Sequence, residues 1–168
     1  MKTKLIIIIL LITSNIFGQG LKDSETQVHQ YIGFAGGSTT GWGISYRYIE
    51  NKYGFQANLF GGYERNKQAN LDIGGTLLYQ VDEAANNNLY LYYSNMLYYY
   101  NDMQYNQNPI TGQYISNKSL MWNTGVGFDI EFNTSRQIVF NLMLGFGAYD
   151  SFKMVTLAGE IGVHYRFQ

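Results

Sequence analysis

Apolar and polar residues alternate with a period of two along most of this chain, whereas a helical period is hard to find. Successive side chains of a strand point to opposite faces, so this alternation predicts strands with one apolar and one polar face. Two segments, 28–36 and the tyrosine-rich 89–100, are less regular, and the second does not show which face is inward. The alternation is clean in six segments, 41–50, 53–63, 71–81, 120–132, 138–149 and 155–167. The chain is therefore predicted to be all-β with eight strands.

The two faces differ in chemistry. Apart from Glu50 at a strand end, the apolar face of the clean strands carries no charged, amide or imidazole side chain, and the polar face is rich in glycine. A soluble ligand-binding barrel, which buries its apolar face, is one interpretation. Small residues in a crowded lumen and aromatic side chains at both membrane interfaces favour the other, with the apolar face on lipid. One aromatic rim would hold Tyr48, Tyr53, Tyr79, Phe132, Tyr165 and Phe167, and the opposite rim Trp42, Tyr63 and Trp122.

Backbone chemistry predicts that such a sheet closes. The hydrocarbon layer has no water to satisfy an open edge, so an even number of strands must pair the first with the last. Strands of about 9–11 residues match a tilted crossing of that layer. We expect an eight-stranded antiparallel up-and-down transmembrane β-barrel in the bacterial cell outer membrane. Connections 51–52, 82–88 and 133–136 would face the periplasm, and 37–40, 64–70, 101–118 and 150–153 the outside.

The beginning of the chain predicts export. Lys2 and Lys4 precede an apolar run over residues 5–12, and small residues follow at 18–20. This is the order of a secretory signal peptide, and the run is much shorter than the ~20 apolar residues of a spanning helix. We expect a signal peptide over 1–18, cut at 18–20, and a single barrel domain over 19–168. An uncleaved N-terminal anchor is the alternative.

The amino-acid composition excludes several classes of function. The chain has no Cys, so disulfides, zinc–cysteine sites, thiol catalysis and a lipid-modified N-terminal Cys are excluded. A net charge of −1 without a run of Lys or Arg argues against nucleic acid as a partner. The sequence also carries no catalytic, metal or nucleotide motif above background. The expectation is a protein without cofactors and without enzymatic activity.

Ionisable residues on the polar face are the candidate functional cluster. Eight strands leave an interior just wide enough for side chains to fill, so these residues are predicted to form a hydrogen-bonded plug. A proton or ion path and catalysis are the alternatives. Arg47 is expected to lie across the lumen from Asp129 and Glu131. The predicted lumen cluster consists of Arg47, Asp129, Glu131, Glu160, His164 and Arg166.

Two histidines, His29 and His164, lie near the ends of the first and last predicted strands, and these two strands become neighbours when the barrel closes. Together with Glu160 they have the chemistry of a metal site or a general-base pair, although no spacing motif supports either. Acyl hydrolysis needs Ser, His and a carboxylate within hydrogen-bond reach. Both histidines map to the predicted periplasmic half, which counts against chemistry on lipid A.

The last strand carries a recognisable pattern. Glu160, Gly162, Tyr165 and Phe167 resemble the four defining positions of the C-terminal assembly signal of bacterial outer-membrane barrels, although Gln168 follows the final aromatic residue. Together with the strand count, the mature chain resembles the class of the OmpA transmembrane domain and OmpX. The resemblance implies insertion by the barrel-assembly machinery, outer-membrane lipid as the surroundings, and a monomer. It implies no particular activity, since this fold hosts anchors, adhesins and lipid-modifying enzymes.

The longest predicted connection, 101–118, is polar and contains the only proline, Pro109. Long loops on a rigid scaffold often carry function, so Tyr105, Pro109 and Tyr114 are the candidate contacts for an extracellular partner; a solvated loop with no partner is the alternative. The function expected is a non-enzymatic outer-membrane protein acting in envelope integrity or surface interaction. A lipid-modifying enzyme is the alternative, and a water-filled pore is disfavoured because it needs roughly 16 strands. The sequence identifies neither the partner nor the physiological process.

Overall fold

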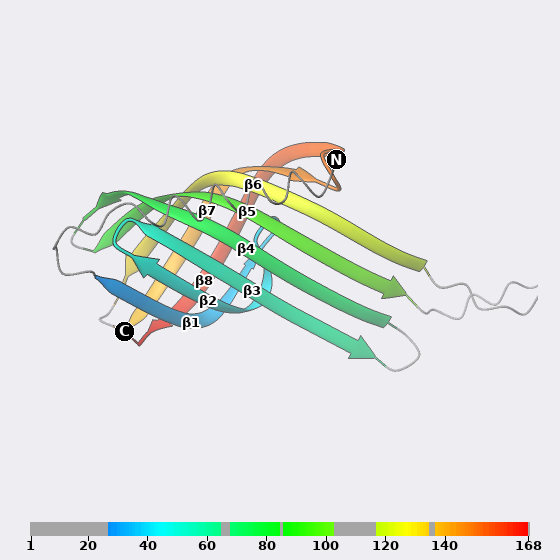
Figure 1. Cartoon of the computed structure of the whole chain (residues 1–168), viewed down its shortest axis with the longest axis horizontal. Coiled ribbons are helices and arrows are strands. Elements are labelled where there is room, and N and C mark those ends of the chain that lie inside the picture. The colour runs from blue at the N-terminus through cyan, green and yellow to red at the C-terminus, as the bar shows by residue number, and fades with distance from the viewer. Residues whose placement is uncertain (1–26, 65–67, 85, 103–116, 135–136, 168) are drawn as a thin grey trace, which may run out of the picture.

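The computed structural model describes residues 27–64, 68–84, 86–102, 117–134 and 137–167 of the chain. They form a closed antiparallel barrel of eight strands that follow one another in sequence order (Figure 1), which confirms the predicted fold. In the described residues no helix is both long and apolar enough to span a membrane. The predicted signal peptide lies outside this part of the chain. The strands are β1 (Val28–Gly37), β2 (Gly41–Glu50), β3 (Tyr53–Glu64), β4 (Gln68–Glu83), β5 (Asn87–Asp102), β6 (Asn117–Asn133), β7 (Ile138–Tyr149) and β8 (Met154–Arg166).

Pairing between the first and last strands closes the sheet. β1 pairs with β8 from Tyr31↔Arg166 to Gly37↔Glu160, while its other edge pairs with β2. We call the end of the barrel where β1 begins and β8 ends the terminal end, and the opposite one the far end. The predicted two-residue turn is at the terminal end, where Asn51 adopts a φ of 53° between β2 and β3.

Four neighbouring strands continue beyond the far end of the barrel. β2 stops pairing with β3 at Ile44↔Leu59, whereas β3 and β4 stay paired as far as Glu64↔Gln68. On the other side, β5 and β6 are paired from Asp102↔Asn117, although β7 joins β6 only at Thr124. Figure 1 shows β3 to β6 projecting together past the other strands. The predicted bounds of β4, β5 and β6 were too short, because polar residues occupy both faces of this extension and apolar alternation stops there.

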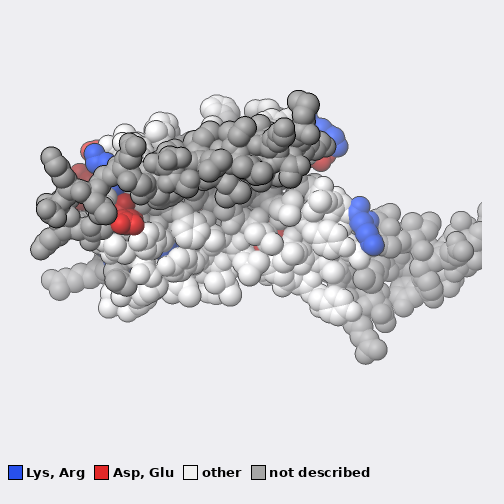
Figure 2. Space-filling view, viewed as in Figure 1, with Lys and Arg blue, Asp and Glu red and all other residues white. Residues whose placement is uncertain are grey.

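The barrel is apolar outside and polar inside, as predicted. Phe34, Leu157 and Ile161 are 71%, 74% and 68% exposed on the outer surface, whereas Arg47 and Asp129 are fully buried in the lumen. In Figure 2 most of the surface that grey atoms leave visible is white, small charged patches show between the white side chains, and most of the visible charged side chains lie toward the two ends. This distribution is the reverse of a water-soluble barrel, which buries its apolar face.

Aromatic side chains form the two predicted rims. At the terminal end Tyr53 and Tyr79 pack against each other from adjacent strands, with ring centroids 5.4 Å apart. At the far end Trp42, Tyr63 and Trp122 all point outward and are exposed. The tyrosine-rich strand β5, whose inward face the sequence did not show, points Tyr90, Tyr92 and Ser94 into the lumen and Leu91, Tyr93 and Leu97 outward.

The connection between β1 and β2 folds into the barrel, which corrects the prediction that residues 37–40 face outside. Thr39 and Thr40 are 1% and 2% exposed. Gly43 has a φ of 123°, in a region that side-chain-bearing residues rarely adopt, and this backbone bends β2 inward. Small side chains and glycine allow the turn to fit within the lumen, so the far end is closed by the chain itself.

Hydrogen bonds from several strands hold this inward turn. Asn58 Nδ2 donates to the carbonyl oxygens of Thr40 and Gly41, at 3.0 and 3.3 Å. On the opposite side Ser94 Oγ donates to Thr39 Oγ1 at 3.0 Å. Gly74 faces the turn so closely that a Cβ there would overlap the Thr40 carbonyl oxygen. The glycine-rich polar face therefore makes room for backbone rather than only for side chains.

Two adjacent glycines of β4 test this packing. Gly74→Ala is expected to lower the free energy of unfolding in detergent by about 1–3 kcal/mol, because the added methyl group overpacks the site. Gly75→Ala is the matched control, since a Cβ there has no neighbouring atom within 4 Å. The control should be neutral or slightly stabilising. Equal urea midpoints for the two variants would contradict the inward position of the turn.

Candidate functional site

The lumen is lined by polar side chains from strands all around the barrel. This site is built by the period-two geometry of strands, which points every second residue inward. The predicted residues Arg47, Asp129, Glu131, Glu160 and His164 are buried there, and Arg166 is half-buried at the terminal end. Other buried polar residues lining the lumen include Ser45, Gln56, Asn58, Thr76, Ser94, Asn123 and Asn141.

An ion cluster crosses the lumen near the terminal end. Arg47 Nη2 of β2 lies 2.5 Å from Asp129 Oδ2 and 3.6 Å from Glu131 Oε2, both on β6. Arg166 Nη2 of β8 lies 3.5 Å from Glu131 Oε1. The Arg47 guanidinium also stacks over the ring of Tyr90, 5.1 Å from its centroid. Two guanidinium groups thus face two carboxylates, in the arrangement that the strand order predicted for Arg47.

Glu160 is held by neutral donors instead of a cation. Gln56 Nε2 donates to Glu160 Oε1 at 2.7 Å, and Asn58 Nδ2 donates to Oε2 at 3.0 Å. Asn141 Nδ2 donates to Glu160 Oε1 at 3.1 Å and to Asp129 Oδ1 at 3.4 Å. One amide therefore connects the two parts of the site, and the polar groups form a continuous network from the inward turn to the ion cluster.

The first and last strands are neighbours, as predicted, but the two histidines lie at different positions along them. His164 lies opposite Gly33 in the β1–β8 pairing, four positions from His29, which at about 3.3 Å per residue is roughly 13 Å along the strand. His164 Nε2 is within 2.9 Å of Ser45 Oγ. Within the described residues no group of three or more His, Asp or Glu side chains is placed to hold a metal ion.

Ser45 and His164 are residue types found in hydrolytic sites, but their surroundings differ from those of such a site. Acyl transfer needs a nucleophile that reaches substrate and a base that a third group orients. Ser45 is 0% exposed and His164 is 1% exposed, and His164 Nδ1 has no hydrogen-bond partner. Glu160 is engaged by the amides of other strands. This geometry fits a structural hydrogen bond.

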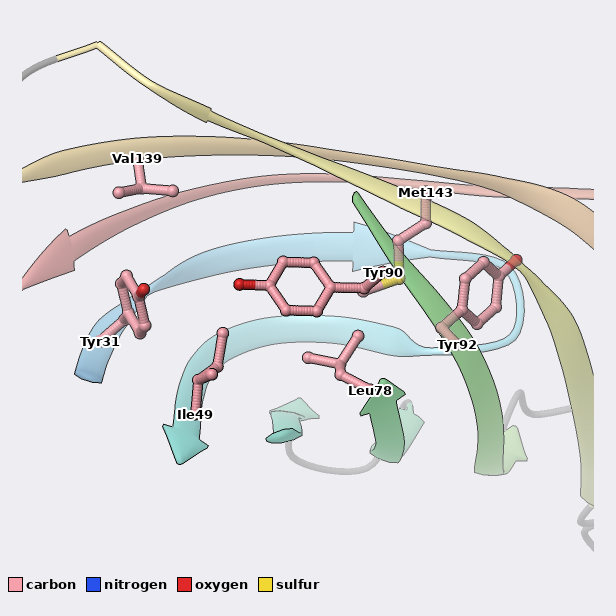
Figure 3. Close-up of a cluster of buried hydrophobic side chains, with 7 residues drawn as sticks. All are labelled: Tyr31, Ile49, Leu78, Tyr90, Tyr92, Val139 and Met143. Carbon is pink, nitrogen blue, oxygen red and sulfur yellow. The ribbon is translucent and has the colours of Figure 1, made fainter. Parts of the chain in front are cut away.

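Apolar and aromatic side chains also fill the lumen, although the sequence had predicted only polar residues there. Figure 3 shows them pointing into the barrel from strands on its different sides. The spacing in the sequence could have identified them. Met143 lies two positions from Asn141 and two from Gly145, so it shares their inward face. The cluster consists of Tyr31, Ile49, Leu78, Tyr90, Tyr92, Val139 and Met143. With the inward turn, these side chains make the lumen a packed core.

The remaining predicted residues fall in different places. Glu160 and Gly162 point inward from β8, whereas Tyr165 and Phe167 point outward at the terminal end, 46% and 51% exposed. The candidate partner loop with Tyr105, Pro109 and Tyr114 lies outside the described residues.

Removal of the central cation tests the lumen network. Arg47→Ala leaves two buried carboxylates without their shared partner, so unfolding in detergent should become easier by about 3–5 kcal/mol. Lys153→Ala is the control for an ion pair at the surface, because Lys153 Nζ lies 2.7 Å from Asp150 Oδ2 and its side chain is 74% exposed. The control should change stability by at most about 1 kcal/mol. An unchanged melting profile for Arg47→Ala would remove the cross-lumen pair as a stabilising element.

No family model and no curated protein matches this sequence. Among solved structures, the chain is similar to the N-terminal β-barrel domain of Pseudomonas aeruginosa OprF, with 14% identity over 85% of this chain and 100% of that chain and a TM-score of 0.48. It is also similar to Ail, the attachment invasion locus protein of Yersinia pestis, with 16% identity, coverage of 86% and 100%, and a TM-score of 0.44. For Neisserial surface protein A the identity is 16%, the coverage 85% and 96%, and the TM-score 0.42. The likeness to each is one of fold.

Proposed function

We propose that this chain is a non-enzymatic integral protein of the bacterial outer membrane, acting in envelope integrity or surface interaction through its far end. The observation that carries the proposal is the inverted barrel, with an apolar surface on every side and charged groups buried within. Soluble monomers rarely expose continuous apolar patches larger than a few hundred Å². A hydrocarbon layer removes this cost, because lipid tails contact the outward Phe, Leu, Ile and Val side chains.

The backbone supports the same surroundings. In hydrocarbon, each unsatisfied N–H or C=O group costs several kcal/mol, so spanning sheets are closed. The pairing of β1 with β8 leaves no open sheet edge between Tyr31↔Arg166 and Gly37↔Glu160. Where the sheet opens, in the extension of β3 to β6, the strands carry polar residues such as Asn70, Tyr98 and Lys118. An open, polar extension belongs in water, which supports a position of the extension outside the hydrocarbon.

A packed lumen favours a scaffold over a channel or an enzyme. The inward turn closes the far end, and the ion cluster and aromatic side chains occupy the space below it. The buried position of Ser45 and His164 leaves no path for an acyl chain to reach them, so lipid modification is the less supported function. The contact surface available to a partner is the far end, where the chain projects from the barrel.

The placement of the last residues supports insertion by the barrel-assembly machinery. Tyr165 and Phe167 present their rings on the outer surface at the terminal end, where an assembly factor has access before lipid surrounds the barrel. Phe167→Ala should then lower the assembled fraction in cells, while refolding in detergent is unchanged. Phe146→Ala is the control, because this outward ring is 63% exposed in β7 and lies outside the proposed signal. Equal assembled fractions for the two variants would contradict the signal.

Two outward positions of equal exposure test the membrane location. Leu144 lies midway along β7 and Met154 begins β8 at the far end, and each side chain is 56% exposed. In lipid vesicles, Leu144→Arg should cost about 2–4 kcal/mol of folding free energy, whereas Met154→Arg should cost about 0–1, because the penalty falls toward the interface. Urea titration of the refolded proteins measures both values.

A water-soluble barrel gives a different result in the same experiment. Both arginines would then face water, and the two variants would be equally stable without detergent. The wild-type protein in planar bilayers tests the closed lumen, since a stable unitary conductance would contradict the packed interior.

A further inference from the structure

We infer that a groove beside the inward turn binds a membrane lipid whose head group ends in an ammonium next to a phosphate. The inference rests on the proposed membrane location, which supplies the lipid. The groove has a volume of about 1000 Å³ and lies at the far end, between the tip of the β1–β2 hairpin and the extension of β3 and β4. It forms because β2 bends inward at Gly43 while β3 continues straight and paired to β4.

The outer part of the groove fits an alkyl chain. Its walls are the outward side chains of four adjacent strands, and Phe34, Ile44 and Leu59 are 71%, 57% and 55% exposed there. Ile161 of β8 continues the same surface. These residues lie on the apolar surface of the barrel, so an acyl chain reaches them from the surrounding lipid without crossing a polar layer.

The inner part of the groove carries a buried carboxylate. Asp72 of β4 is 4% exposed, and it accepts a hydrogen bond from the Trp42 backbone N–H. Its Oδ1 atom has no hydrogen-bond partner. Of the residues with such an unpartnered buried atom in the described part of the chain, Asp72 is the one that lines this groove. A buried carboxylate oxygen is stabilised by a donor, and strongly by a charged one.

Three aromatic residues line the same groove as the carboxylate, and their rings favour a cation as the ligand. Trp42, Phe60 and Tyr98 line the same groove as Asp72. Organic ammonium groups bind to the faces of such rings, with Trp the most favourable, while sulfate or phosphate alone would be repelled by Asp72. Asn70 and the Tyr98 hydroxyl add hydrogen-bond donors for a phosphate next to the ammonium. A phosphoethanolamine head group combines these features, and a phosphoglycerol head group lacks the cation.

The chain contains its own reporter for the experiment. It has two tryptophans, so Trp122→Phe leaves Trp42, which lines the groove, as the sole source of indole emission. The folded variant in an uncharged maltoside detergent is titrated with lysophosphatidylethanolamine and with lysophosphatidylglycerol of the same acyl chain. Trp42 emission should change saturably with the first lipid and at least about tenfold more weakly with the second, as the loss of one charged hydrogen bond predicts.

Asp72→Asn in the same background removes the charge and keeps an oxygen that accepts from the Trp42 N–H. It should weaken binding of the ammonium lipid by about tenfold or more and abolish the preference between the two lipids. Asp150→Asn is the matched control, since this acidic residue lies in the turn before β8 at the far end and is not part of the groove. The control should bind like its parent.

Equal affinity for the two lipids, or a preference that survives Asp72→Asn, would overturn the inference. Heat-modifiable migration on gels reports folding of each variant separately, so a loss of binding is distinguished from a loss of the barrel. If Asp72→Asn fails to fold, Tyr98→Leu takes its place, because it removes an aromatic ring that lines the groove and is not part of the lumen network. Unchanged affinity in that variant would count against the site.

Discussion

Pairing of β1 with β8 is the constraint on which the rest of this structure depends. Closure at eight strands fixes a lumen that side chains can fill completely. Polar groups in such a space must satisfy one another, because burying an unpaired charge costs several kcal/mol. Arg47 therefore finds its partner, Asp129, on the opposite side of the barrel, and Glu160 is held by amides from β3 and β7.

The same closure explains how glycine is used. A turn that enters a narrow lumen brings backbone against backbone, and a methyl group at Gly74 would overlap the Thr40 carbonyl oxygen. Asn58 satisfies the carbonyl oxygens of the turn from inside, so the buried backbone is not left without partners. Gly74, Gly125 and Gly147 thus make room for the inward turn, and this turn occupies the space that solvent would fill in an open barrel.

Much of this fold could be predicted from the sequence, because alternation reports directly on which side of a sheet is apolar. The closure and the contact between Arg47 and Asp129 follow from strand order, and the orientation of the faces follows from the glycine-rich polar face and the aromatic rims. The inward turn could not be predicted, since Gly37–Thr40 reads as an ordinary polar connection. Its position depends on space made by glycines of strands distant in sequence. The apolar lumen residues were predictable in principle, but apolar residues such as Val139 and Met143 do not stand out on a face whose other residues are polar or glycine.

The groove lies at the boundary between the closed barrel and the extension of β3 to β6. Below it, β2 and β3 are paired as a barrel in hydrocarbon requires; above it, β2 turns inward to close the lumen and β3 continues into the extension. In the proposed membrane location, the gap between β2 and β3 has lipid on one side and polar groups on the other. Asp72 lies on the polar side, where it accepts a hydrogen bond from the bent backbone at Trp42. The bend that closes the lumen also creates the amphipathic surface, so sealing the barrel and binding a lipid head group depend on the same residues.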